Sequence, residues 1–131
     1  MAGTIVANTI NTDTGAYLTA NALTGVAKAW VNFGYVSSAL TTRASYNVSS
    51  VTRVSTGIYT INFPAGVMAD ANYVFAGSAE SLSGNVTSQI YASGGVGTAP
   101  TLKTTTQCQI NFSAGGSLSD IYTASAIFLG N

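Results

Sequence analysis

Apolar and polar residues alternate with a period of two along most of this chain. Apolar residues alternate with polar ones over 59–63 and 107–112, and over 27–33 Ala27, Ala29, Val31 and Phe33 share one face and Lys28, Trp30 and Asn32 the other. This period is typical of strands that bury one face of a sheet. Helical spacing is weak, since its best stretch, 18–30, contains Gly25 and ends in alternating residues. The sequence therefore predicts an all-β fold.

Turn residues divide the alternating pattern into short strands. The clearest hairpin joins 50–54 to 58–63 through Gly57, because a glycine supplies the positive φ angle that a tight loop needs. Pro64 then ends the pairing, since it has no amide N–H to donate. About seven or eight strands, with turns roughly every 8–12 residues, favour an antiparallel β-sandwich or barrel-like domain. The remaining strands are predicted at 46–49, 73–77, 86–91 and 121–129.

The chain of 131 residues is long enough for one domain with a substantial core. Its first part alternates only weakly, is interrupted by Gly15 and Gly25, and carries too little apolar bulk to form a core alone. We therefore expect residues 1–26 to form an extended N-terminal arm that attaches to a neighbouring molecule. Residues 27–131 are expected to form the β-sandwich domain.

Ionic side chains are scarce: four are basic, four are acidic, and the net charge is zero. At the usual share of a quarter, a chain of this length would carry about 33 of them. A free monomer normally stays dispersed through a mixed, charged surface and a net charge away from zero. The composition therefore predicts a protein that works in an assembly, covered by copies of itself or by partners.

Two classes of partner are not expected. Four dispersed cations argue against nucleic acid, whose binding requires that a run of phosphates be neutralised. No stretch approaches the roughly 18 uncharged apolar residues of a membrane span, so we expect no membrane insertion.

The residues that usually carry catalysis are missing or dispersed. There is no histidine, the commonest general base, and the one cysteine, Cys108, lies in an apolar alternation and is predicted to be a core residue. One cysteine without histidine excludes the usual zinc sites. Asp70 and Asp120 are predicted in turns, although Asp70 with Glu80 is kept as an alternative catalytic pair. We therefore expect no enzyme activity and assign no catalytic, cofactor-binding or metal-ligating residue.

Aromatic side chains are the remaining candidates for a functional role. The single tryptophan, Trp30, and most of the seven tyrosines fall in alternating strand positions. They are predicted to lie in the core or in subunit contacts. Stacking on sugar rings is the alternative, because such side chains combine an apolar ring with a polar group.

Four segments in a fixed order resemble a known family. They read Lys-Ala-Trp-Val-Asn-Phe, Asn-Val-Ser-Ser, Tyr-Thr-Ile-Asn-Phe and Met-Ala-Asp-Ala-Asn-Tyr, at 28–33, 47–50, 59–63 and 68–73. Together they resemble a module of tail-fibre and related surface-fibre proteins of bacteriophages, and the match covers 27–77 well and 104–131 loosely. The resemblance implies a virion protein with a β-rich fold, assembled as a homotrimer, and it carries over no catalytic residue.

The leading hypothesis is therefore a non-enzymatic structural protein of the virion, a surface or tail-fibre component. Residues 1–26 would contact other virion proteins, and loops at 82–85 and 93–100 would contact a host surface glycan. One alternative is a capsid cement or decoration protein that stabilises the head, with the arm adding strands to its neighbours. A second is a soluble carbohydrate-binding module that uses Trp30 or loop tyrosines. A third is a glycan depolymerase.

Overall fold

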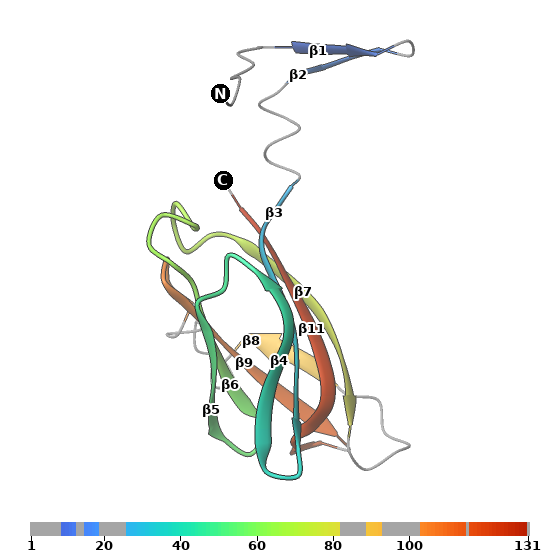
Figure 1. Cartoon of the computed structure of the whole chain (residues 1–131), viewed down its shortest axis with the longest axis vertical. Helices are drawn as coiled ribbons and strands as arrows, with labels where there is room; N and C mark the ends of the chain where they lie inside the picture. The colour runs from blue at the N-terminus through green and yellow to red at the C-terminus, as the bar shows by residue number, and fades with distance from the viewer. Residues whose placement is uncertain are drawn as a thin grey trace.

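The computed structural model describes residues 9–12, 15–18, 26–81, 89–92, 103–114 and 116–130 (Figure 1). Within these ranges the chain forms strands and no helix, which confirms the predicted all-β class. The described residues accordingly contain no helix long and apolar enough to cross a membrane. The strands are β1 (Thr9–Thr12), β2 (Gly15–Leu18), β3 (Ala27–Val36), β4 (Ala39–Tyr46), β5 (Ser50–Ser55), β6 (Ile58–Asn62), β7 (Val74–Ser81), β8 (Gln89–Ala92), β9 (Gln107–Ala114), β10 (Ser117–Leu118) and β11 (Ile121–Leu129).

Nine of these strands form two antiparallel sheets (Figure 1). The first, called here the β3 sheet, has the order β4-β3-β11-β7. The second, called the β6 sheet, has the order β10-β9-β6-β5, and β8 also pairs with β9. The two sheets form separate layers that face each other, so the body is β-sandwich-like, as predicted.

The predicted arm, residues 1–26, is described only in part. Strands β1 and β2 pair with each other as a short antiparallel hairpin in which Thr12 is opposite Gly15. The other residues of this segment up to 25 lie outside the described residues, so its extended form stays a prediction.

The core lies between the two sheets. Alternate residues of β3, β6, β9 and β11 are almost completely buried, as the sequence alternation predicts. Aromatic rings pack edge to face or tilted, with the ring centre of Phe33 lying 5.4 Å from Tyr59 and 6.2 Å from Phe112. A second aromatic group includes Phe63 and Phe128, whose ring centres are 4.9 Å apart. These rings join the two layers.

The predicted hairpin over 50–63 is confirmed. Strands β5 and β6 pair antiparallel, and Gly57 in the turn has a φ angle of 69°. Its amide donates to Asp120 Oδ1 over 3.1 Å, and its carbonyl accepts from the amide of Phe112 over 2.8 Å. A Cβ atom at this position would lie 2.7 Å from the carbonyl oxygen of Phe112. The turn therefore requires glycine both for the positive φ angle and for this close approach.

Strand β4 and the segment after it differ from the sequence prediction. The predicted strand at 46–49 is wrong, because β4 ends at Tyr46 and the next residue, Asn47, has a positive φ of 54°. Asn47 can adopt this angle because its side-chain amide donates to the carbonyl of Lys28 over 2.7 Å. The pattern also does not predict β4 itself, because nearly all its side chains are exposed and no apolar alternation marks it.

Strand β11 completes the β3 sheet between β3 and β7. It pairs with β3 from Ala27 to Phe33 and with β7 from Val74 to Ser81. Three segments that are far apart in the sequence therefore share one outer face, and this face carries the candidate site.

Candidate functional site

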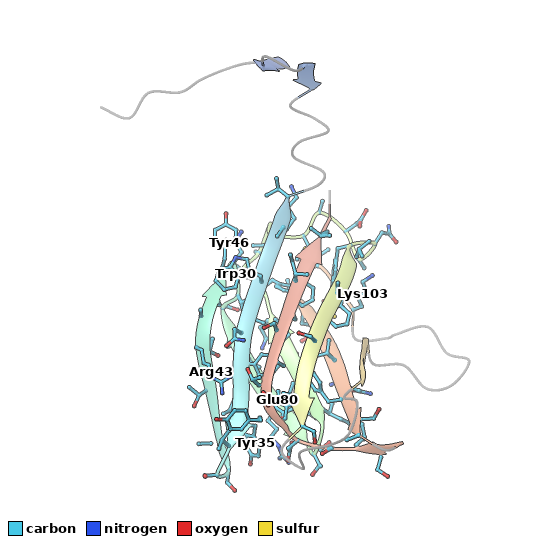
Figure 2. The ribbon with its side chains drawn as sticks, turned by 90° about the vertical axis from the view of Figure 1, so that its right-hand side faces the viewer. Trp30, Tyr35, Arg43, Tyr46, Glu80 and Lys103 are labelled. Atoms are coloured by element: carbon cyan, nitrogen blue, oxygen red, sulfur yellow. The ribbon has the colours of Figure 1, made fainter. Side chains whose placement is uncertain are left out.

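The outer face of the β3 sheet gathers exposed hydrophobic side chains. Of the eight large hydrophobic residues that are exposed in the described part of the chain, five lie on the strands of this sheet at outward positions. Figure 2 shows two of them, Trp30 and Tyr46, close together near the upper end of the sheet. The five are Trp30, Tyr46, Val74, Tyr122 and Ile127.

Trp30 lies in a row of apolar residues that crosses the sheet. In the strand register Trp30 is opposite Tyr46 on β4 and Ile127 on β11, and Ile127 is opposite Ala76 on β7. The Trp30 side chain is 40% exposed and that of Ile127 38%. Trp30 is therefore outside the core, which leaves subunit contact or stacking on a ligand as its predicted role.

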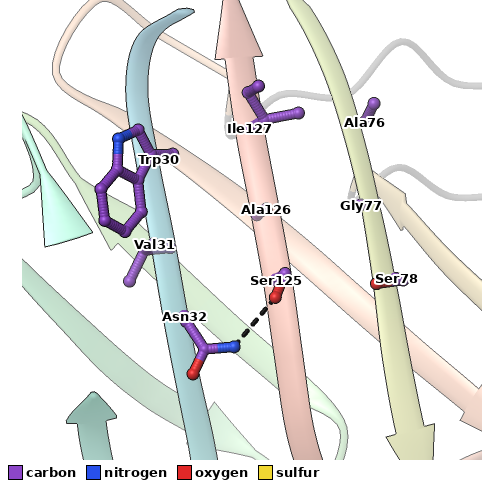
Figure 3. A pocket seen from close by; sticks show the side chains of 9 residues that line it. All are labelled: Trp30, Val31, Asn32, Ala76, Gly77, Ser78, Ser125, Ala126 and Ile127. Atoms are coloured by element: carbon purple, nitrogen blue, oxygen red, sulfur yellow. Dashed lines mark hydrogen bonds between the residues drawn. The ribbon is translucent and has the colours of Figure 1, made fainter. Parts of the chain in front are cut away.

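A row of polar residues runs beside the apolar row, two residues along each strand. Asn32 on β3 is opposite Ser125 on β11, which is opposite Ser78 on β7. The amide of Asn32 donates to Ser125 Oγ over 2.9 Å and to the carbonyl oxygen of Ala124 over 3.3 Å. These bonds hold the amide group of Asn32 across the strand boundary, as Figure 3 shows for Ser125.

A groove of about 380 Å³ lies between the two rows (Figure 3). Its floor is the intermediate row of Val31, Ala126 and Gly77, which are opposite one another in the register. Gly77 has no side chain, and Val31 and Ala126 are buried. No charged side chain lines the groove, whose walls are Trp30, Ile127 and Ala76 on one side and Asn32, Ser125 and Ser78 on the other.

Arg43 lies further down the same sheet than Trp30 and Tyr46 (Figure 2). Its guanidinium donates from Nη1 to the carbonyl of Phe33 over 3.1 Å and to Thr123 Oγ1 over 2.7 Å, and from Nη2 to the carbonyl of Tyr122 over 3.0 Å. The guanidinium lies over Gly34, where a side chain would collide with it. Arg43 therefore acts as a cross-strand clamp between β3, β4 and β11.

Asp120 and Arg53 form an ion pair at the start of β11. Arg53 donates from Nε to Asp120 Oδ1 over 2.9 Å and from Nη2 to Oδ2 over 2.8 Å. Asp120 Oδ1 also accepts from Tyr59 Oη over 2.8 Å and from the Gly57 amide. The guanidinium of Arg53 stacks 4.4 Å from the ring centre of Tyr35. All of these contacts join residues of the same chain. The carboxylate of Asp120 therefore stabilises the fold.

This ion pair predicts a loss of stability in acid. The hydrogen bonds from Arg53 hold the pKa of Asp120 below its ordinary value of 3.8, against the opposing effect of burial. The stabilisation is therefore present above about pH 4 and is lost as the pH falls through the lower pKa of the folded state. Unfolding by urea, measured between pH 2 and 7, is expected to show this loss, and the Asp120→Asn variant is expected to show a flatter profile. If the free energy of unfolding fell equally steeply with pH in the two proteins, the stabilising role given to the Arg53–Asp120 pair would be wrong.

Cys108 is the predicted core residue, and its side chain is fully buried. Burial raises the pKa of its thiol, which keeps the sulfur protonated and therefore a poor nucleophile. Nearby, Tyr73 donates from its hydroxyl to the carbonyl of Gln107 over 3.1 Å, and the ammonium of Lys103 lies 4.6 Å from the Tyr73 ring centre. These contacts pack the core and create no open site.

The carboxylates kept as an alternative catalytic pair are far apart along the sheet. Asp70 accepts a hydrogen bond from the Asn72 amide over 2.7 Å, the turn contact that the sequence predicts. Val74 follows that turn, and Glu80 lies six residues further along β7, so the Cα atoms of Val74 and Glu80 are about 20 Å apart at 3.3 Å per residue. A glycosidase pair is at most about 9.5 Å apart. No group of three or more potential metal ligands was found in the described ranges.

The loops predicted to contact a glycan, 82–85 and 93–100, lie outside the described residues. The groove beside Trp30 was not predicted as a site. The alternation of 27–33 places Trp30 and Asn32 together on the face of the strand opposite Val31 and Phe33. Their neighbours on β7 and β11 come from strands that only the fold brings together. No match was found when the chain was compared with protein-family models, with curated proteins and with solved structures. Its class is therefore defined by the fold: an all-β protein with two antiparallel, sandwich-like sheets.

Proposed function

We propose that this protein is a non-enzymatic structural component of a bacteriophage virion, displayed on the particle surface as part of a fibre and assembled as a homotrimer. In this proposal residues 1–26 attach the β domain to other virion proteins. The observation that carries it is a surface with very few free ionic groups that also exposes large hydrophobic side chains.

Four of the seven ionic side chains in the described ranges make contacts with residues that are distant in the sequence. Arg53 and Asp120 neutralise each other, and Arg43 is held by two carbonyl oxygens and a hydroxyl group. Lys103 lies on the ring of Tyr73. Little charge is left to keep separate molecules apart, which is the usual function of a charged surface. Neighbouring subunits that cover part of the surface would remove this need.

Exposed hydrophobic side chains occur away from the Trp30 groove as well. Val26 is 55% exposed at the start of the β domain, and Val54 is 56% exposed next to the β5–β6 turn. Leu118 is exposed on β10. Scattered residues of this kind are normal on a charged monomer, but here they occur on a surface without compensating charge. They suit contacts with copies of the chain or with other virion proteins.

The outer face of the β6 sheet is covered by hydroxyl and amide groups. Asn62 donates to Ser50 Oγ over 3.0 Å, and Gln109 donates to Thr60 Oγ1 over 3.5 Å, each across a strand boundary. Such a neutral, hydrogen-bonded surface keeps its geometry without ion pairs and is insensitive to salt. These properties suit a protein that is displayed at high density outside a cell.

Labelling of intact particles tests the proposal. Gold-conjugated antibodies against the purified chain are expected to bind purified phage particles at the tail, and excess free chain is expected to abolish the label. Label over the head would favour the cement-protein alternative instead. Particles that contain no copy of the chain, by labelling and by peptide mass spectrometry, would overturn the proposal.

A further inference from the structure

We propose that the groove on the outer face of the β3 sheet binds a neutral pyranose sugar. Trp30 forms its stacking wall, and Asn32, Ser125 and Ser78 form its hydrogen-bonding wall. The inference deepens the proposed function and rests on it for the source of the sugar, a glycan of the host surface. It places the sugar contact on the sheet, in addition to the loops expected from the sequence.

The groove has an apolar side and a polar side, as a sugar ring does. A pyranose presents apolar C–H groups on its faces and hydroxyl groups around its rim. Here an apolar wall and a polar wall run in parallel, about 7 Å apart, because they are two residues apart along each strand. A ring lying over the groove would rest its C–H face on Trp30 and Ile127 and direct its rim hydroxyl groups toward Asn32 and Ser125 (Figure 3).

The polar wall offers both kinds of hydrogen-bonding group. The Asn32 amide nitrogen is engaged with Ser125 and Ala124, which fixes the group, and Oδ1 points along β3 away from Trp30, where it can accept from a ligand that extends past Asn32 (Figure 3). Ser125 Oγ accepts that bond, so its own proton is available for donation. Ser78 adds a further hydroxyl group on β7. Adjacent hydroxyl groups of a sugar, which both donate and accept, match this arrangement.

The apolar wall and the absence of charge restrict the ligand class. Figure 3 shows the indole of Trp30 face-on in a view onto the sheet, so its broad side points outward, and the residue is 40% exposed. Such a ring stacks on the C–H face of a sugar. Since no charged side chain lines the groove, a carboxylated or phosphorylated sugar would lose hydration without an ionic partner. The chemistry therefore selects neutral sugars.

The size of the groove agrees with one sugar residue and part of the next. Its volume of about 380 Å³ is near the lower end of the range for small-ligand sites, roughly 300–1,000 Å³. It lies on an open sheet face instead of a closed cavity, so both ends of a polysaccharide chain can leave it. An open site of this kind is expected to bind weakly, with a dissociation constant of about 1 mM.

The single tryptophan makes the site directly observable. The purified full chain is titrated with neutral sugars (glucose, galactose, mannose, N-acetylglucosamine and their oligomers) and with glucuronate as the charged control. At least one neutral sugar is expected to change Trp30 emission and to shift the backbone amide signals of Asn32, Gly77 and Ser125. Glucuronate is expected to change neither. No response to any neutral sugar at about 10 mM, ten times the expected dissociation constant, would overturn the proposal.

Three variants separate binding from folding. Trp30→Ala removes the stacking wall, and Ser78→Phe fills the groove while Trp30 remains; each is expected to weaken binding by about tenfold or more, measured by amide shifts. The matched control, Tyr122→Ala, removes another exposed aromatic side chain of the same face, outside the groove, and is expected to bind normally. Equal weakening by all three would contradict the assignment.

A second copy of the chain is the competing occupant of this face. If it covers the groove, Trp30→Ala is expected to change the oligomeric state in sedimentation, and this result would overturn the proposal. The titration uses the isolated protein, so absence of sugar binding leaves the virion assignment standing. Conversely, absence of the chain from particles would leave a measured sugar affinity intact.

Discussion

Replacing Gly34 by valine is expected to lower the free energy of unfolding by about 3 kcal/mol, the upper end of the usual cost of overpacking. Gly34 lies in β3, where a Cβ atom would collide with the carbonyl oxygen of Tyr122 and would lie 2.7 Å from Arg43 Nη2. The carbonyl belongs to the backbone of β11 and cannot rotate away. The new side chain would therefore separate the two strands and displace the Arg43 clamp.

The matched control for Gly34→Val is Ala44→Val. Ala44 lies on the adjacent strand β4, where its side chain is exposed. Valine is favoured in strands, so this change is expected to alter stability by less than about 0.5 kcal/mol. Chemical unfolding followed by far-UV circular dichroism measures the free energy of unfolding of both variants. Similar stability of the two variants would show that the close approach at Gly34 is not structurally important.

Replacing Asp120 by alanine is expected to lower the free energy of unfolding by about 2 kcal/mol, because the hydroxyl of Tyr59 and the amide of Gly57 lose their acceptor. The change also removes the partner of Arg53 on β5. Since Asp120 precedes β11 and both donors belong to the β5–β6 hairpin, its loss loosens the contact between the two sheets.

The comparison for Asp120→Ala is Asp70→Ala. Asp70 is exposed, and its carboxylate accepts a short-range hydrogen bond from the Asn72 amide. Its replacement is expected to cost less than about 1 kcal/mol. Thermal unfolding at pH 7 compares the stability of the two variants with that of the wild type. A larger loss for Asp70→Ala than for Asp120→Ala would refute the structural role given to the ion pair.

The fold class could be predicted because the period-two pattern is strong where one face of a strand is buried. Tyr59 and Ile61 alternate with Thr60 in the sequence, and the structure buries the first two. Strand β4 escaped prediction for the opposite reason: it buries little, so its side chains need no alternation. The strand is held by its backbone hydrogen bonds to β3 and by the contacts of Arg43. Neither kind of contact produces a residue pattern from which the strand could be predicted.

The candidate site could be predicted only in part. Alternation placed Trp30 and Asn32 on one face of the same strand, and the alternative of sugar stacking followed from the residue type. That this face points outward is shown by the structure, where Trp30 is 40% exposed. The partners Ser125 and Ser78 lie on strands whose order depends on β11 closing between β3 and β7. The Arg53–Asp120 pair was not predicted, because 67 residues separate its members.

A surface with so few free ionic groups is expected to be covered in an assembly. We expect sedimentation equilibrium of the full chain at physiological salt, over a wide range of protein concentration, to show association to a trimer. The Trp30→Ala variant is expected to associate as strongly as the wild type. A single monomeric species that stays dispersed at every concentration would contradict the expected assembly.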